Sequence, residues 1–203
     1  MKTDIILAGV GGQGILSIAT VIGLAAVGNG LHIKQAEVHG MSQRGGAVYS
    51  HLRVSDNPVA SDLIPLGKAD LVLSAEPMEA LRYLPYLSPD GWVVTSTHPF
   101  VNIGNYPDLQ ELTQQLNALP RRILTDADAL AAECGNVKAS NMVMLGAAVP
   151  FLNIGFQHIE AAVRSIFERK GAEVTDMNIR ALHAGYAATV NGKQEQTQTN
   201  IRS

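Results

Sequence analysis

The sequence predicts a doubly wound α/β domain whose mostly parallel sheet carries helices on both faces and is followed by a helical C-terminal part. Two observations indicate this fold class. The apolar run Asp4–Ala8 passes through a glycine-rich turn directly into a segment with helical spacing. Further short apolar runs then alternate with amphipathic segments, as expected when helices join parallel strands. Because 203 residues fill one well-buried domain, we expect a single domain at 1–190 and a disordered polar tail at 191–203.

The first elements are a strand, a helix and a second strand. Asp4–Ala8 is almost continuously apolar, which is typical of a parallel strand covered on both faces. A helical pattern opens at Gly14 and ends at Gly28. A strand at Leu31–Glu37 completes a βαβ unit. Apolar and polar side chains alternate through Ala47–Val54, which predicts a half-exposed strand that runs antiparallel at the sheet edge.

The remaining elements follow from the same patterns. A strand at Leu71–Leu73 leads to the helix start Glu76-Pro77, because proline is favoured in the first turn of a helix. Pro85 ends that helix. Later come a strand at 92–95, a helix at 109–119 with Asp108 as its cap, a strand at 122–124, and helices at about 127–134, 141–152, 159–170 and 177–188.

Composition argues against two classes of partner. The net charge is −3, so no basic excess draws the chain to nucleic acid or to an anionic membrane surface. The apolar run near the amino terminus is broken by Gly9, and it is too short for a signal peptide or a membrane span. We therefore expect a cytoplasmic protein without a nucleic-acid or membrane partner.

The residues that bind metals are sparse. Cys134 is the only cysteine, so the chain cannot supply the thiolates of an iron–sulfur cluster, and we expect a buried structural role for it. The six histidines include no pair at ligand spacing, and none lies beside the cysteine. We predict no metal site and assign no catalytic residue. Redox chemistry linked to this chain must take place on another molecule.

The sharpest local motif is Gly9-Val10-Gly11-Gly12-Gln13-Gly14, which has the form G-x-G-x-x-G between a strand and a helix. In a Rossmann-like fold such a turn exposes backbone amides that can hold a pyrophosphate, and Glu37 stands where an acid would meet a ribose hydroxyl. The same glycines also suit tight packing of the first helix on the sheet, or the approach of a partner. Both interpretations stay open from the motif alone.

A second motif spans Glu37–Gly46 and contains Ser42, Gln43 and Arg44. The two glycines that follow Arg44 leave its guanidinium open to a phosphate or a carboxylate. Arginine is equally favoured at subunit interfaces, so an inter-subunit contact is the alternative. His39 as a general base is a weaker hypothesis, because no nucleophile or orienting acid can be assigned to it.

Two smaller features have ordinary structural explanations. Glu76 stands where a side chain can reach a ligand at the carboxyl edge of the sheet, but a helix start is the simpler interpretation. Met142 and Met144 lie beside other apolar residues, which favours core or interface positions over a cofactor pocket.

Four motifs together resemble the gamma-type subunit of the pyruvate/2-oxoacid ferredoxin oxidoreductase family, with the indolepyruvate ferredoxin oxidoreductase beta subunits as the closest likeness. The resemblance extends from Thr3 to about Tyr186. It rests on Gly9–Gly14, Glu37–Gly46, Glu76–Arg82 and Asn141–Ala147, in that order.

The resemblance implies a subunit of a complex that converts a 2-oxoacid and coenzyme A to acyl-CoA and CO2 and reduces ferredoxin. It also implies that thiamine diphosphate, Mg and 4Fe-4S clusters reside on a catalytic alpha-type partner. The sequence agrees, because it has one cysteine and no Gly-Asp-Gly followed by asparagine. We expect an aryl pyruvate as the 2-oxoacid. The loops at Gly9–Gly14 and around Arg44 are then expected to face the partner and border the coenzyme A path.

Two other functions remain as alternatives. One is a free-standing NAD(P)-dependent dehydrogenase that uses the glycine turn and Glu37. It is disfavoured because the chain after the sheet offers mainly helices rather than a second substrate-binding region. The other is a small regulatory module that binds an adenine nucleotide.

Overall fold

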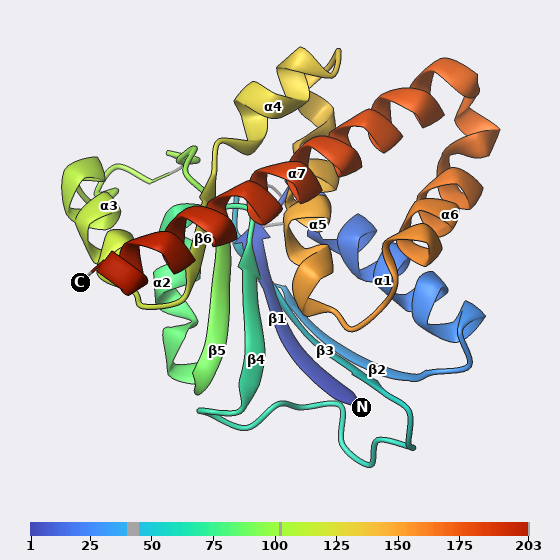
Figure 1. Ribbon diagram of the computed structural model, residues 1–203, viewed down its shortest axis with the longest axis horizontal. Coiled ribbons are helices and arrows are strands. Elements are labelled where there is room, and N and C mark those ends of the chain that lie inside the picture. The colour runs from blue at the N-terminus through green and yellow to red at the C-terminus, as the bar shows by residue number, and fades with distance from the viewer. Residues whose placement is uncertain (40–44, 102, 203) are drawn as a thin grey trace.

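The computed structural model describes residues 1–39, 45–101 and 103–202, except for the side chains of His39 and of residues 193–202. Its centre is a six-stranded sheet with the order β2-β3-β1-β4-β5-β6 (Figure 1). The strands are β1 (Lys2–Val10), β2 (His32–His39), β3 (Ala47–Ser55), β4 (Ala69–Ser74), β5 (Leu87–Ser96) and β6 (Arg122–Thr125).

Strand direction confirms the mostly parallel sheet. β1, β4, β5 and β6 run parallel, while β3 is antiparallel to both of its neighbours, β1 and β2. The antiparallel direction predicted for 47–54 is therefore confirmed, but its place at the sheet edge is wrong. The βαβ unit is also modified, because β3 inserts between β1 and β2. As an internal strand, β3 has no exposed residue, in contrast to the half-exposed strand predicted.

The helices follow the predicted order. They are α1 (Ile15–Gly28), α2 (Pro77–Arg82), α3 (Leu109–Asn117), α4 (Ala127–Glu133), α5 (Ser140–Ala148), α6 (Phe156–Phe167) and α7 (Ala172–Arg202). Short 3-10 turns occur at η1 (Leu84–Tyr86), η2 (Val137–Ala139), η3 (Val149–Phe151) and η4 (Glu168–Lys170). No helix in the described part of the chain is long and apolar enough to cross a membrane.

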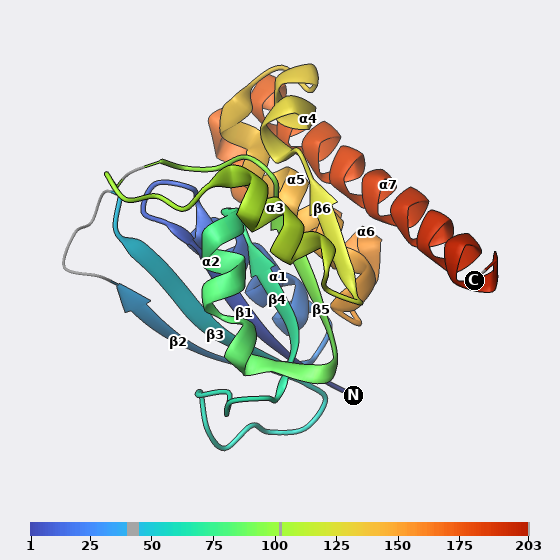
Figure 2. The same ribbon diagram turned by 90° about the vertical axis from the view of Figure 1, so that its left-hand side faces the viewer.

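Helices cover both faces of the sheet because successive strand residues point to opposite sides. On one face, Ile5 and Leu7 of β1 pack in a core with residues of α1, α5, α6 and α7. On the other, Ile6 and Ala8 pack with Ala80 of α2 and with residues of β4, β5 and α3. Figure 2 shows α2 and α3 in front of the strands, and Figure 1 shows α7 passing across α5. The result is the predicted three-layer, doubly wound arrangement.

The C-terminal helices differ from prediction in length. α7 begins five residues before the expected start, and its bounds are Ala172–Arg202. The disordered tail expected at 191–203 stays a prediction. Met142 and Met144 are fully buried in the core beneath α7, as predicted.

Candidate functional site

The glycine turn is fastened to the sheet by the side chain of Gln13. Its Oε1 accepts a hydrogen bond from Val10 N at 2.8 Å, and its Nε2 donates to Ala75 O at 3.2 Å. The amide therefore joins the carboxyl ends of β1 and β4. Because both of its polar atoms are engaged, Gln13 acts as a brace in this structure.

Close packing explains two of the glycines. A Cβ on Gly9 would lie 2.8 Å from Cδ1 of Ile15. Gly14 has φ +75°, and a Cβ there would lie 2.5 Å from Nδ2 of Asn141. By contrast, a Cβ on Gly12 would meet nothing within 4 Å, so its backbone borders open space. Both interpretations of the motif therefore apply to the turn: Gly9 and Gly14 are closely packed, and Gly12 is open.

The turn also meets the loop between β2 and β3. Gly11 N donates to Gly46 O at 2.9 Å, and Gly45 N donates to Gly11 O at 3.3 Å. These backbone bonds place the end of the second motif against the first. Ser42, Gln43 and Arg44 lie outside the described residues, as does the side chain of His39.

An open pocket of about 560 Å³ lies beside the turn, at the carboxyl ends of β1, β4, β5 and β6; we call it the carboxyl-edge pocket. Such a crevice is the usual ligand position in an open α/β sheet. Its lining comes from segments far apart in sequence: Gly12, Gln13, Gly14, Ala75, Ser96, His98, Phe100, Ala127, Asp128, Val137, Lys138, Ser140, Asn141 and Met144.

A smaller, mostly apolar pocket of about 260 Å³ lies on the other side of the turn. Val10, Ile15, Leu16 and Val48 contribute to its lining, and the turn contributes glycines. Gly12 and Gly14 line both pockets. The glycine turn is therefore a shared wall, and its bare backbone is accessible from two directions.

The polar lining of the carboxyl-edge pocket suits a ligand with a negatively charged group. α1 begins at the turn without a side-chain cap, so the positive end of its dipole faces this region. Lys138 adds a cationic side chain. Asp128 offsets part of this charge, with its Oδ2 3.7 Å from Nε2 of His98.

Glu76 is fully buried beside the pocket. Its Oε2 accepts from Glu79 N at 2.8 Å, which caps α2 and confirms the predicted helix start. Its Oε1 accepts from the backbone N of Phe100 at 3.4 Å and from the hydroxyl of Tyr106. Burial raises the pKa of nearby Glu79, and the Glu76 carboxylate adds to the rise, although Arg82 opposes it.

Glu37 does not join the site. It lies in β2 opposite Ser50 of β3, so a whole strand separates it from β1, and it lines neither pocket at the glycine turn. The reason is the insertion of β3. In a plain βαβ unit the second strand ends closer to the turn, where its acid can meet a ribose.

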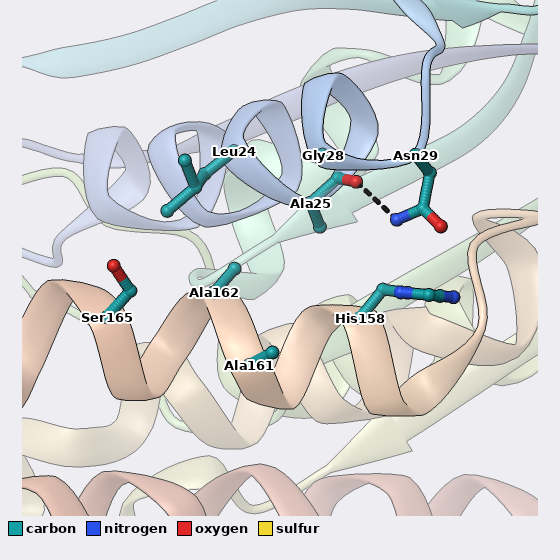
Figure 3. Close-up of a pocket in the computed structure, with 8 residues that line it drawn as sticks. All are labelled: Leu24, Ala25, Gly28, Asn29, His158, Ala161, Ala162 and Ser165. Carbon is teal, nitrogen blue, oxygen red and sulfur yellow. Dashed lines mark hydrogen bonds between the residues drawn. The ribbon is translucent and has the colours of Figure 1, made fainter.

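Another pocket, of about 280 Å³, lies between α1 and α6, toward the opposite end of α1 (Figure 3). Leu24 and Ala25 face Ala162 across it. The Asn29 amide at its end donates to Ala25 O at 2.7 Å and is therefore engaged within the chain. This mostly aliphatic lining carries no grouping suited to catalysis.

Several residues of the carboxyl-edge pocket were not predicted as site residues from the sequence. Ser96 is the last residue of β5 and His98 follows that strand, while Asp128 follows β6 at the start of α4. They belong to no motif, but each stands at or just after the carboxyl end of a parallel strand, and this position alone predicts a place at the carboxyl edge. Among the described residues, no group of three or more His, Cys, Asp or Glu side chains could hold a metal ion.

Known proteins share both the sequence and the fold. Indolepyruvate oxidoreductase subunit IorB from Archaeoglobus fulgidus is 38% identical over 202 residues, 95% of this chain and 98% of the relative. The gamma subunit of a keto/oxoacid ferredoxin oxidoreductase from Geobacter sulfurreducens has the same fold, with a TM-score of 0.68 and 22% identity over 93% of this chain and 99% of that chain.

A longer protein contains the same fold as one part. The structure of 2-oxoglutarate:ferredoxin oxidoreductase from Magnetococcus marinus matches 94% of this chain with a TM-score of 0.76 and 22% identity, but this match covers only 31% of that chain. Residues 4–188 match the family model described as pyruvate ferredoxin/flavodoxin oxidoreductase. The resemblance seen in the four motifs is thereby confirmed: the chain belongs to the pyruvate ferredoxin/flavodoxin oxidoreductase family.

Proposed function

We propose that this chain is the small, non-catalytic subunit of a ferredoxin-dependent oxidoreductase complex that acts on indolepyruvate or a related aryl pyruvate. The complex would convert the 2-oxoacid and coenzyme A to acyl-CoA and CO2 and pass two electrons to ferredoxin. Family membership supports the reaction class. The 38% identity to an indolepyruvate oxidoreductase subunit, over nearly the full length of both chains, supports the aryl substrate.

The proposed division of labour follows from what this chain contains. One cysteine cannot ligate a 4Fe-4S cluster, and no Gly-Asp-Gly motif is present to hold thiamine diphosphate with its Mg. Both groups would therefore be carried by the catalytic alpha-type partner, together with the chemistry that they supply. This chain would contribute a binding surface.

The carboxyl-edge pocket carries the proposal for that surface. Gly12 leaves its backbone open, the positive end of α1 faces the turn, and Lys138 lines the same space. Coenzyme A is rich in phosphates, which helix amino termini and lysines bind. The Magnetococcus marinus relative, of which one part has this fold, was solved with coenzyme A and succinyl-CoA bound. We propose that the coenzyme A path runs along Gly9–Gly14 and the loop around Arg44, and that both loops face the partner.

Co-purification from the native source tests the complex. We expect a large partner that contains thiamine diphosphate and iron, and reduction of ferredoxin that depends on an aryl pyruvate and on coenzyme A. A preference for pyruvate or 2-oxoglutarate would correct the substrate only. A lone chain that carries a nicotinamide would overturn the proposal, and calorimetry with NAD, NADP, ATP and coenzyme A would then identify its ligand.

Two substitutions test the surface. We expect Lys138→Ala to raise the KM for coenzyme A about tenfold, because one charge-assisted bond to a phosphate is lost. Arg44→Ala should weaken either assembly of the complex or coenzyme A binding. Arg121→Ala is the matched control. This arginine pairs with exposed Asp90 and directly precedes β6, so it lies at the amino end of the strand, away from the carboxyl-edge pocket. If both variants match the control in assembly and in KM, the surface is assigned wrongly.

A further inference from the structure

The segment between β5 and α3 forms one wall of the carboxyl-edge pocket. Its described residues are 97–101 and 103–108, and we call it the wall segment. His98 and Phe100 of this segment line the pocket. Their positions therefore help to define the space that a ligand can occupy.

Little apolar packing holds the wall segment in place. The residues Phe100, Val101 and Ile103 are 42%, 66% and 41% exposed. Large hydrophobic residues that remain this exposed contribute little burial energy to fix the chain that carries them. Other interactions must set the position of the wall segment.

Glu76 provides two of these interactions through a single oxygen. Its Oε1 accepts from Phe100 N at 3.4 Å and from the Tyr106 hydroxyl. A third bond, at 3.2 Å, runs from His98 N to Oγ of Ser96 at the end of β5. Both ends of the wall segment are thus attached, and the buried carboxylate attaches the middle and the far end.

The chemistry of the Glu76–Tyr106 pair favours a persistent bond. Burial raises the pKa of Tyr106 far above its ordinary value, and the bond to Glu76 raises it further, so the phenol keeps its proton as a donor. A buried acceptor such as Oε1 of Glu76 is also costly to leave without a hydrogen bond. The carboxylate is fixed in turn by the backbone N of Glu79.

We propose that Glu76 is a positioning residue for the carboxyl-edge pocket. Glu76 fixes the wall segment because it holds Phe100 and Tyr106. The fixed segment in turn places His98 and Phe100 against the ligand of the pocket, which accepts the acyl group in the proposed reaction. The tether is a property of this chain alone. The identity of the acceptor as coenzyme A rests on the proposed function.

Hydrogen exchange of the full-length chain tests the tether. Tyr106→Phe removes the donor but keeps the ring and the cap of α2, and the Phe100 amide should then exchange about tenfold faster or more. Tyr83→Phe is the matched control, because this buried ring contacts Tyr49 and Tyr86 in the same layer. Equal exchange at Phe100 in the two variants would overturn the tether.

Kinetics of the purified complex test the consequence. We expect Tyr106→Phe to raise the KM for coenzyme A about three- to tenfold, while kcat and the KM for the 2-oxoacid change less than twofold. Glu76→Gln keeps one acceptor oxygen and should lie between the wild type and Glu76→Ala. Faster exchange at Phe100 with a coenzyme A KM equal to that of Tyr83→Phe would overturn the positioning role.

The two proposals fail differently. If the wild-type complex shows no dependence on coenzyme A, the proposed function fails before any variant is made. The exchange experiment still decides whether Glu76 holds the wall segment.

Discussion

Gly146 of α5 and Gly185 of α7 lie where the backbones of the two helices touch. A Cβ on Gly146 would lie 2.0 Å from Leu182 O, and one on Gly185 would lie 1.9 Å from Val143 O. Side chains normally separate packed helices, whereas glycine has no Cβ and leaves room for this backbone contact. The contact holds α5, whose first residues line the carboxyl-edge pocket, firmly beneath α7.

Gly146→Ala should therefore lower the free energy of unfolding by about 3 kcal/mol, because the added methyl group meets backbone that cannot move aside. Urea unfolding measures the change. Gly28→Ala is the control, since a Cβ there meets nothing within 4 Å and alanine is the better helix former by up to about 1 kcal/mol. Equal unfolding midpoints for the two variants would show that α5 and α7 can separate at little cost.

Gly14→Ala should be destabilising for a different reason. The left-handed backbone at φ +75° disfavours alanine by about 1–2 kcal/mol, and the new methyl group meets the Asn141 amide. Asn141→Ala removes the close contact. Gly14→Ala made in that background should therefore lower the free energy of unfolding only by the cost of the left-handed backbone. Thermal unfolding of the four proteins separates the two contributions. Strictly additive effects would argue against a clash with Asn141.

The Asp4–Arg53 pair should dominate stability in acid. Burial on its own raises the pKa of Asp4, but bonds from Arg53 and Lys2 outweigh it and hold the pKa below the ordinary value of 3.8. The stabilisation is therefore complete above that value and is lost as the pH falls through the folded pKa. At pH 7, Asp4→Asn should cost about 3 kcal/mol, because it leaves the partly buried Arg53 guanidinium without its counter-ion.

Urea midpoints from pH 2 to 7 test this pair. Asp90→Asn breaks an exposed pair with Arg121 and should change stability by less than about 1 kcal/mol. The urea midpoint of the wild type should fall below pH 4, and that of the Asp4→Asn protein should fall less over the same range. A variant that behaves like Asp90→Asn at every pH would show that the buried pair contributes nothing net.

His51 should produce a separate effect near neutral pH. Burial lowers its pKa below 6.5, and the Arg53 guanidinium adds to the shift. Its Nδ1 accepts a hydrogen bond from Ile64 N at 3.1 Å, which needs the unprotonated nitrogen. Because the unfolded chain binds this proton first, the stabilisation is full above about pH 6.5 and falls as the pH drops toward the folded pKa.

The measurement for His51 is stability between pH 5 and 7.5 together with exchange of the Ile64 amide. The wild type should lose stability on acidification over this range, while His51→Gln, which does not titrate there, should give a flatter curve. Parallel curves would assign the dependence to other groups.

Local patterns predicted most elements because they report on single segments. The apolar runs at Asp4–Ala8 and Leu71–Leu73 lie in β1 and β4. A strand buried on both faces consists almost entirely of apolar residues, so its sequence identifies it. The order of strands in the sheet is not a local property. Nothing in the alternation of Ala47–Val54 distinguishes an edge strand from an internal one, so the insertion of β3 was missed.

Site residues were found from the sequence only where a motif exists. The glycine turn was placed correctly from its spacing, but Gln13 gave no sign that its amide reaches Ala75, 62 residues away. The role of Glu76 was half predicted. That Glu76 caps α2 follows from the residues directly after it in the chain. The bond from Tyr106 depends on the path of a segment 30 residues later, which returns to lie beside Glu76.

The reversed direction of β3 couples the two glycine-containing motifs mechanically. Because β2 and β3 form a hairpin, their connection returns at the edge where β1 ends, and Gly11 bonds to Gly45 and Gly46 directly. Insertions in that hairpin would shift both sides of the junction at once. A backbone displacement on either side of this junction is therefore passed to the other through these two bonds.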